Sequence, residues 1–190
     1  MKTISAIILA AGKSIRMGRQ KMLLPWGDGT VLGKVIKTLQ ASEIEDIILV
    51  TNSEISSSVS HHKLRITLND EGEMLTSIQL GLQAQKASVE AALVCLGDQP
   101  QIEEGSVRSV CEAFQKNKFD LIVPSYQMRR GHPWLVARPL WDEILGMRGG
   151  SMREFLNAHT EEIKYVNLDT PAILQDIDTP EDYLKYKPPL

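Results

Sequence analysis

The sequence predicts an α/β fold, with three layers in which helices cover both faces of a mostly parallel sheet. Four short apolar runs recur along the 190 residues, and the first three are rich in Ile, Leu, Val and Ala without alternation. Strands buried on both faces have this composition, and such strands belong to parallel sheets covered by helices. Because helix-period segments separate the runs, we expect right-handed crossovers and an α/β/α sandwich. The four runs are Ile4–Leu9, Asp46–Val50, Ala91–Leu96 and Asp120–Val123.

Apolar residues at helical spacing predict a helix over Val31–Ala41, with Thr30 as its N-cap. The same periodicity predicts helices over Met74–Gln85 and Gly105–Lys116. The polar, serine-rich segment Glu54–His62 is interpreted as a short helix or a loop. Further strands are predicted at Leu64–Leu68, Trp134–Ala137 and Ile163–Leu168, and further helices at Pro139–Leu145 and Ser151–Ala158.

The last helix is predicted from its first turn. Thr179 suits the N-cap, Pro180 suits the first helical position, and Asp182 suits the N-terminal end of the helix dipole. We expect this helix to end near Pro188. Ser151 has the same N-cap character before the preceding helix.

Length and composition restrict the class of protein. One core fits a chain of this length, so we expect a single domain over 1–190. The net charge of −3 gives no overall field to hold nucleic acid or an anionic membrane. With no secretory signal and no apolar run of about 18–20 residues, a cytoplasmic protein is expected. Core packing is the expected role of Cys95, Cys111, Trp26, Trp134 and Trp141.

The stretch from Leu9 to Lys21 has the composition of an anion site. It follows an apolar run and carries two glycines and four cations, so backbone N–H groups and fixed positive charge can meet an anion there. It is not a P-loop, because five residues separate Gly12 from Gly18. It is not a dinucleotide fingerprint either, since Ser14 stands where the second glycine belongs.

This stretch resembles the Leu-Ala-Ala-Gly-x-Ser-x-Arg-Met-Gly-x-x-Lys signature of the MobA-like NTP transferase superfamily. Within it the chain is most similar to the molybdenum cofactor nucleotidyltransferases, particularly their cytidylyltransferase branch. Ala11 and Gly97-Asp98-Gln99 favour that branch over the guanylyltransferases, and hence CTP over GTP. The other matching segments are Leu96–Pro100, Gly131–Pro133 and Asp176–Asp182.

The resemblance implies a Rossmann-like sheet of the glycosyltransferase-A type. It also implies Mg²⁺-dependent transfer of CMP from CTP to the phosphate of a molybdopterin-type acceptor, with release of pyrophosphate. The partners implied are these two substrates and, for the product, a molybdoenzyme or its maturation chaperone. Neither nucleic acid nor a membrane is expected as a partner.

Charge neutralisation is the main requirement of such a reaction, because several phosphate charges meet as pyrophosphate leaves. Arg16 and Lys21 are assigned to the triphosphate, whereas Lys13 and Arg19 are expected to face solvent. Asp98 follows a buried strand and suits a hard cation such as Mg²⁺. The family pattern makes Asp178 its partner, with a turn role or replacement by Asp176 left open.

The nucleotide site implied by the resemblance comprises Leu9, Ala10, Ala11, Gly12, Lys21, Asn69 and Ser77. For Asn69 and Ser77 a purely structural role in a turn and a helix stays open. Arg129, Arg130 and His132 are assigned to the acceptor, and His132 has a structural alternative at a turn. The segment Met147–Arg153 lacks an acidic residue common in the family, so the acceptor itself stays open.

Three alternatives follow from these open points. The same chemistry could serve another acceptor, such as a sugar phosphate or an alcohol phosphate. The fold could instead bind a pterin or nucleotide without turnover, as a maturation or carrier protein. A Rossmann-type oxidoreductase is the third alternative, and the missing dinucleotide fingerprint counts against it.

Overall fold

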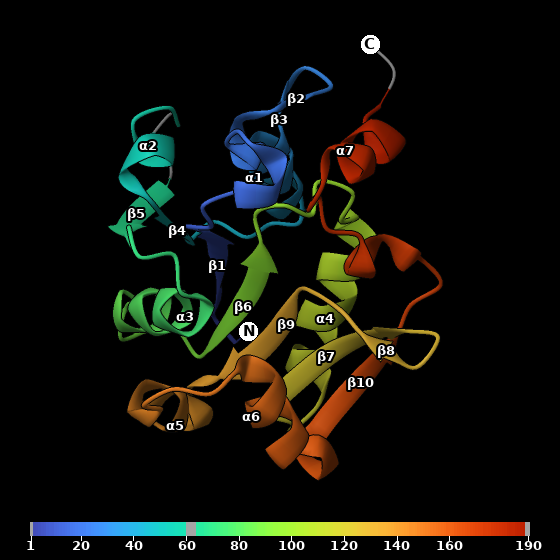
Figure 1. Cartoon of the computed structure of the whole chain (residues 1–190). Coiled ribbons are helices and arrows are strands. Elements are labelled where there is room, and N and C mark those ends of the chain that lie inside the picture. The colour runs from blue at the N-terminus through green and yellow to red at the C-terminus, as the bar shows by residue number, and fades with distance from the viewer. Residues whose placement is uncertain (1, 60–63, 189–190) are drawn as a thin grey trace.

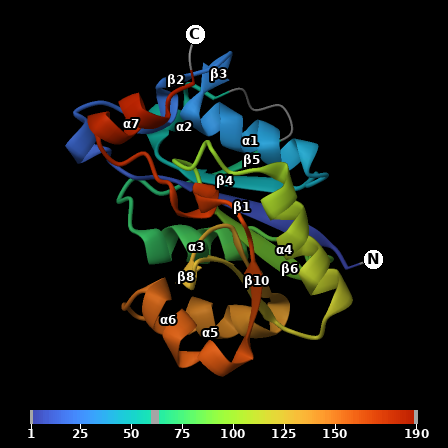
Figure 2. The ribbon, with the colours of Figure 1, turned by 90° about the vertical axis from the view of Figure 1, so that its right-hand side faces the viewer.

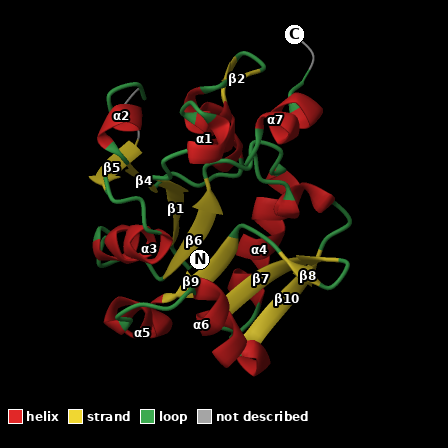
Figure 3. Cartoon of the chain, viewed as in Figure 1, coloured by secondary structure: helices red, strands yellow, loops and turns green. Residues whose placement is uncertain are grey.

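The computed structural model describes residues 2–59 and 64–188, which form one twisted sheet with helices on both faces (Figures 1 and 2). The predicted three-layer α/β/α sandwich is therefore confirmed. The helices on one face are α1 (Val31–Ala41) and α4 (Glu104–Lys116). Those on the other are α3 (Met74–Gln83), α5 (Trp141–Gly146) and α6 (Met152–Ala158). Two more, α2 (Ser53–Ser56) and α7 (Pro180–Tyr186), lie near the edge that carries the loop after β1 (Figure 3).

The main sheet has the strand order β10-β7-β9-β6-β1-β4-β5, and β8 pairs with β7 outside this path. Strand β1 is parallel to β4 and β6, β4 is parallel to β5, and β7 is parallel to β10. All four predicted apolar runs are strands that begin within one residue of the predicted start. The strands are β1 (Ile4–Ala10), β4 (Ile47–Thr51), β5 (Leu64–Leu68), β6 (Ala91–Leu96), β7 (Leu121–Tyr126), β8 (Arg129–Arg130), β9 (Trp134–Ala137) and β10 (Ile163–Asn167).

Strand β9 runs antiparallel to both of its neighbours, β6 and β7, in the middle of the sheet. The sequence predicts the strand but not its direction, because direction depends on how the chain returns after the short β7–β8 hairpin. A second antiparallel pair, β2 (Pro25–Trp26) with β3 (Gly29–Thr30), was not predicted. Five short 3-10 helices complete the fold: η1 (Ile15–Met17), η2 (Lys21–Leu23), η3 (Arg138–Leu140), η4 (Thr160–Glu162) and η5 (Pro171–Leu174).

The predicted helix caps are confirmed by their hydrogen bonds. Thr30 Oγ1 accepts from the Gly33 N–H at 3.0 Å at the start of α1. Ser151 and Thr179 both form capping boxes, in which the third helical residue bonds back to the cap.

Two predicted helix ranges need correction. Over 139–145, the first residues belong to η3 and the α-helix begins only at Trp141. Helix α3 ends at Gln83 rather than Gln85. In the predicted segment Glu54–His62, α2 occupies the start, and positions 60–62 lie outside the described residues.

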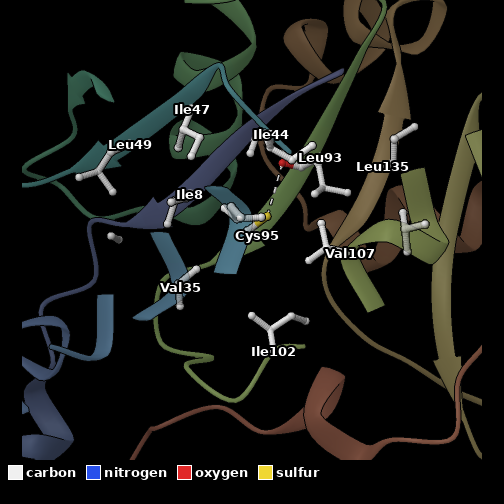
Figure 4. Packing of buried hydrophobic residues seen from close by; sticks show 14 of the residues in the cluster. Ile8, Val35, Ile44, Ile47, Leu49, Leu93, Cys95, Ile102, Val107 and Leu135 are labelled. Atoms are coloured by element: carbon white, nitrogen blue, oxygen red, sulfur yellow. Dashed lines mark hydrogen bonds between the residues drawn. The ribbon is translucent and has the colours of Figure 1, made fainter. Parts of the chain in front are cut away.

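Alternate residues of the central strands point to opposite faces and build two cores. On β1, Ala6 and Ile8 pack toward α1 and α4 with Cys95, whereas Ile7 and Leu9 pack toward α3. Figure 4 shows Ile8 and Cys95 in the first of these cores with Val35 and Val107. This explains why the runs show no polar alternation, since both faces of each strand are buried. The predicted packing roles are confirmed by burial of Cys95, Trp26, Trp134 and Trp141, and Cys111 packs half-buried against the first core.

The carboxyl ends of β1, β4 and β6 lie at one edge of the sheet because these strands are parallel. Open α/β sheets bind ligands at this edge. Among the described residues, no helix has the length and apolar character needed to cross a membrane.

Gly81 in α3 is the point where this helix lies closest to β1. A Cβ at this position would overlap Cγ2 of Ile7, whose β-branched side chain is fixed in the buried strand. We expect Gly81→Ala to lower the free energy of unfolding by about 1–3 kcal/mol, because overpacking outweighs the better helix propensity of alanine. Urea denaturation monitored by circular dichroism measures this change.

The matched control is Gly105→Ala in α4, where no heavy atom lies within 4 Å of the added Cβ. Here only the propensity changes, so stability should rise by up to about 1 kcal/mol. Equal stabilities of the two variants would contradict the close approach of α3 to β1.

Candidate active site

The chain leaves β1 through the loop 11–20, which the side chain of Ser14 organises. Ser14 Oγ accepts a hydrogen bond from the Lys21 N–H at 3.1 Å and donates one to Gln20 Oε1 at 2.8 Å. Ser14 itself has a left-handed backbone, with φ of 50°. The loop therefore closes on itself through Ser14, and this closure fixes the start of η2, where Lys21 stands.

Lys21 lies between two carboxylates that come from distant parts of the sequence. Its Nζ lies 2.5 Å from Asp98 Oδ2 and 2.9 Å from Asp178 Oδ1. Arg16 Nη2 contacts the other oxygen of Asp178 at 3.0 Å. Only 11% of the Lys21 side chain is exposed, whereas Arg16 is 69% exposed at the rim. The structure thus brings together four of the residues that the sequence singles out for catalysis and metal binding.

Backbone hydrogen bonds hold the two aspartates near each other. The Ile177 N–H donates to the Asp98 carbonyl at 2.9 Å, and the Gly97 N–H donates to the Leu9 carbonyl at 3.0 Å. A Cβ on Gly97 would lie 3.1 Å from the same Leu9 oxygen, so a side chain is disfavoured there. The first hydrogen bond joins the segment before α7 to the end of β6. The second joins the end of β6 to the end of β1.

The charges of the cluster stabilise one another. Burial opposes the charge on Lys21, but the carboxylates of Asp98 and Asp178 outweigh it and raise the lysine pKa. Burial likewise disfavours the charged form of Asp178, yet Lys21 and Arg16 hold its pKa below the usual range. At neutral pH, Lys21 and Asp178 are therefore both charged.

Asp176, the alternative metal ligand, has a different partner. Gln99 Nε2 donates to Asp176 Oδ1 at 2.5 Å, and Gln99 itself is buried. Burial, followed by the nearby Asp98 carboxylate, raises the Asp176 pKa to about 6. Asp178, not Asp176, is the aspartate that shares the Lys21 ammonium with Asp98.

The donor set fits a divalent cation that takes its other ligands from a substrate. Asp98 and Asp178 are close enough to hold one small cation between them, as their shared contact with Lys21 demonstrates. In residues 2–59 and 64–188, no cluster of three or more His, Cys, Asp or Glu side chains is arranged to hold a metal. Mg²⁺ is commonly bound by one or two carboxylates plus phosphate oxygens, which matches this pair.

A cavity of about 280 Å³ opens beside the cluster. Its lining combines loop backbone with charged side chains: Gly12, Lys13, Ser14, Ile15, Arg16, Lys21 and Asp178. Lys13 is exposed, in agreement with its expected solvent position, and it also borders the cavity. Arg19 is exposed and is not part of the lining, in agreement with its expected solvent position.

Asn69 and Ser77 are buried and hydrogen-bonded to each other. Asn69 Nδ2 donates to Ser77 Oγ at 2.8 Å and to the Glu73 carbonyl at 3.1 Å, while Asn69 Oδ1 accepts from the Gly72 N–H at 3.2 Å. A Cβ on Gly72 would lie 3.0 Å from the Ala11 carbonyl. These contacts support a structural role for Asn69 and Ser77, because they hold the 69–73 loop and the start of α3 beside the end of β1.

A second cavity, of about 360 Å³, lies between α3, β9 and α6. Its lining is largely apolar, with a few polar groups: Met74, Ile78, Leu96, Arg130, Gly131, His132, Trp134, Ser151, Met152, Arg153, Leu156 and Asp176. Asp176 and Asp178 lie on the two sides of Ile177, so one short segment borders both cavities. Two cavities therefore lie on either side of one acidic segment.

The predicted acceptor residues differ in their positions. Arg130 borders the second cavity, but its guanidinium already donates to Tyr165 Oη at 2.8 Å, Asn157 Oδ1 at 2.7 Å and Thr160 Oγ1 at 3.2 Å. Arg129 is exposed on β8 and is not in the lining, so the structure does not bring it to this cavity. Through these hydrogen bonds the Arg130 guanidinium joins β8 to α6 and β10.

His132 borders the cavity as a neutral group. Burial lowers its pKa to about 4, so the ring carries no charge at neutral pH, and its centroid lies 6.5 Å from that of Trp134. The sequence reasoning missed Arg153, an exposed cation in the cavity lining. In the sequence, Arg153 follows the pair Gly149-Gly150, and both glycines have positive φ in the loop before α6.

Comparisons with known proteins show the family of the chain. Residues 6–163 match the MobA-like NTP transferase domain family. The molybdenum cofactor cytidylyltransferase of Escherichia coli strain K12 is 31% identical over 194 residues, which cover 98% of this chain and 97% of that protein.

Solved structures share the fold. The crystal structure of Rv0371c from Mycobacterium tuberculosis H37Rv has a TM-score of 0.87 at 24% identity and covers 97% of both chains. A manganese complex of Rv0371c has a TM-score of 0.82 at 22% identity, again over 97% of both chains. From the family match and the identity to the Escherichia coli protein, we conclude that the chain belongs to the MobA-like NTP transferase family and is a nucleotidyltransferase.

Proposed function

We propose that the protein is a Mg²⁺-dependent cytidylyltransferase that transfers CMP from CTP to the phosphate of a molybdopterin-type acceptor and releases pyrophosphate. The observation that carries this proposal is the Lys21 ammonium held by Asp98 and Asp178 beside a cation-lined cavity. The similarity to the Escherichia coli molybdenum cofactor cytidylyltransferase supports the choice of nucleotide and acceptor.

In the proposed reaction, an acceptor phosphate oxygen attacks the α-phosphorus of CTP. A new P–O bond forms, the bond from the α-phosphorus to the oxygen of the β-phosphate breaks, and pyrophosphate leaves with that electron pair. The acceptor phosphate is already ionised at neutral pH, so the protein supplies no general base. Lys21 and Arg16 neutralise the phosphate charge, and Gly12 offers its backbone N–H group.

Asp98 and Asp178 are the proposed ligands of Mg²⁺. When bound, the ion supplies positive charge that neutralises and aligns phosphate oxygens. Because Lys21 and Arg16 are opposed by the two aspartates, these four side chains together leave little surplus positive charge for a triphosphate. A divalent cation at the carboxylates would restore that surplus.

The second cavity is the proposed acceptor site. Trp134, Met152 and Leu156 offer an apolar wall for a flat heterocycle, and the neutral His132 ring can exchange one hydrogen bond with it. Arg153 is the proposed partner of the acceptor phosphate, because Arg130 is engaged by neighbouring side chains. The proposed nucleotide contacts of Leu9, Ala10, Ala11, Asn69 and Ser77 lie on the β1 side of the same edge.

We further propose that the chain acts as one nucleotidyltransferase domain in the cytoplasm. A molybdoenzyme or its maturation chaperone is the proposed recipient of the product. Both points rest on the resemblance to the family.

The proposed activity is tested by mass spectrometry of the product. With Mg²⁺, CTP and purified molybdopterin, we expect pyrophosphate and a product whose mass equals the sum of the two substrates less pyrophosphate. GTP and ATP should react more slowly. Asp98→Asn should lower the rate by about 100-fold or more, because it weakens one of the two proposed carboxylate ligands of the Mg²⁺ that neutralises the reacting phosphates.

Asp142→Asn, at an exposed position on α5, is the matched control and should keep the normal rate. Pyrophosphate release only with a sugar phosphate or alcohol phosphate would replace the acceptor. Nucleotide binding without release from any acceptor would favour a binding protein instead.

The acceptor assignment predicts a selective effect of Arg153→Ala. Loss of one charge-assisted hydrogen bond should raise the KM for molybdopterin by about tenfold, while the KM for CTP stays within about twofold. Arg148→Ala removes an exposed cation from the loop before α6 that is not in the cavity lining, and should change neither constant. Equal KM values for Arg153→Ala and the native enzyme would exclude Arg153 from the acceptor site.

A further inference from the structure

The positively charged side chains that line the first cavity differ in whether a carboxylate contacts them. Lys21 contacts both Asp98 and Asp178, and Arg16 contacts Asp178, so two cations face two carboxylates. Lys13 borders the same cavity, and within the described part of the chain it has neither an ion pair nor a side-chain hydrogen bond. The unopposed positive charge of this lining is therefore that of Lys13.

The stem of Lys13 follows the protein surface toward the neighbouring loop. A Cβ on Gly72 would lie 3.8 Å from Lys13 Cγ, and the same point is 3.0 Å from the Ala11 carbonyl. Lys13 thus lies between the loop after β1 and the 69–73 loop. This position is at the cavity rim, and no carboxylate among the described residues pairs with the ammonium group.

We propose that Lys13 binds the polyphosphate of the nucleotide and supplies the surplus positive charge that the Lys21 cluster lacks. The proposal rests on the proposed function, since it assumes that the first cavity takes a nucleoside triphosphate. Lys21 and Arg16 can turn toward phosphate only by giving up contacts with Asp98 and Asp178. Lys13 meets an incoming phosphate without such a loss, and its long stem carries a point charge suited to phosphate.

Arg19 provides a matched control in the same loop. Like Lys13 it is an exposed cation with no ion pair to the described residues, but it does not border the cavity. Removing either side chain changes the net charge by the same amount. A general electrostatic effect would therefore affect both variants alike, whereas a direct contact affects only Lys13.

Calorimetric titration with inorganic tripolyphosphate in excess Mg²⁺ tests the inference without requiring turnover. Lys13→Ala should weaken binding by about tenfold, as expected for one charge-assisted contact. Lys13→Arg should bind within about threefold of the native protein, because the charge is kept, and Arg19→Ala should stay within about twofold. An unchanged thermal midpoint, expected for an exposed side chain, shows that each variant is folded.

Two results overturn the inference separately from the proposed function. If Lys13→Ala and Arg19→Ala weaken binding equally, Lys13 makes no specific contact, although the cavity still binds polyphosphate. If the native protein does not bind tripolyphosphate or CTP at all, the first cavity is not a triphosphate site, and the proposed function fails with it.

Discussion

The Lys21 ammonium shared by Asp98 and Asp178 is the interaction on which the candidate active site depends. It joins the loop after β1, the end of β6 and the segment before α7, which lie far apart in the sequence. Removing Lys21 would leave the largely buried Asp98 carboxylate without its ion-pair partner, which is costly in a protein interior. The same three groups suit a phosphate site, since an ammonium and a carboxylate-bound cation both neutralise phosphate oxygens.

The sheet topology makes this meeting possible. β1 and β6 are parallel neighbours, so Lys21 and Asp98 leave the sheet at the same edge. The antiparallel strand β9 then separates β6 from β7, and its start carries His132 and Trp134 into a second cavity on the other side of Ile177. The reversed strand thus contributes to the second cavity, whereas the first is lined by the loop after β1 and by Asp178.

Much of this structure was predictable from short stretches of the sequence. The buried strands have continuous apolar runs, and Thr30, Ser151 and Thr179 cap helices through contacts with residues only three positions away. The direction of β9 and the engagement of Arg130 by α6 and β10 were not predictable, because both depend on contacts between distant segments. For the same reason the sequence did not indicate that Arg129 lies outside the cavity that His132 borders, or that Arg153 lines it.

The central claim is that Asp98 and Asp178 hold a divalent cation at a nucleotide whose phosphates Lys21 contacts. The most direct measurement is an anomalous difference map from crystals of the protein grown with Mn²⁺ and a non-hydrolysable CTP analogue. We expect one Mn²⁺ peak at the carboxylates of Asp98 and Asp178, with the Lys21 ammonium on a phosphate oxygen. A Mn²⁺ peak away from both carboxylates, with Lys21 still bound between them, would contradict the claim.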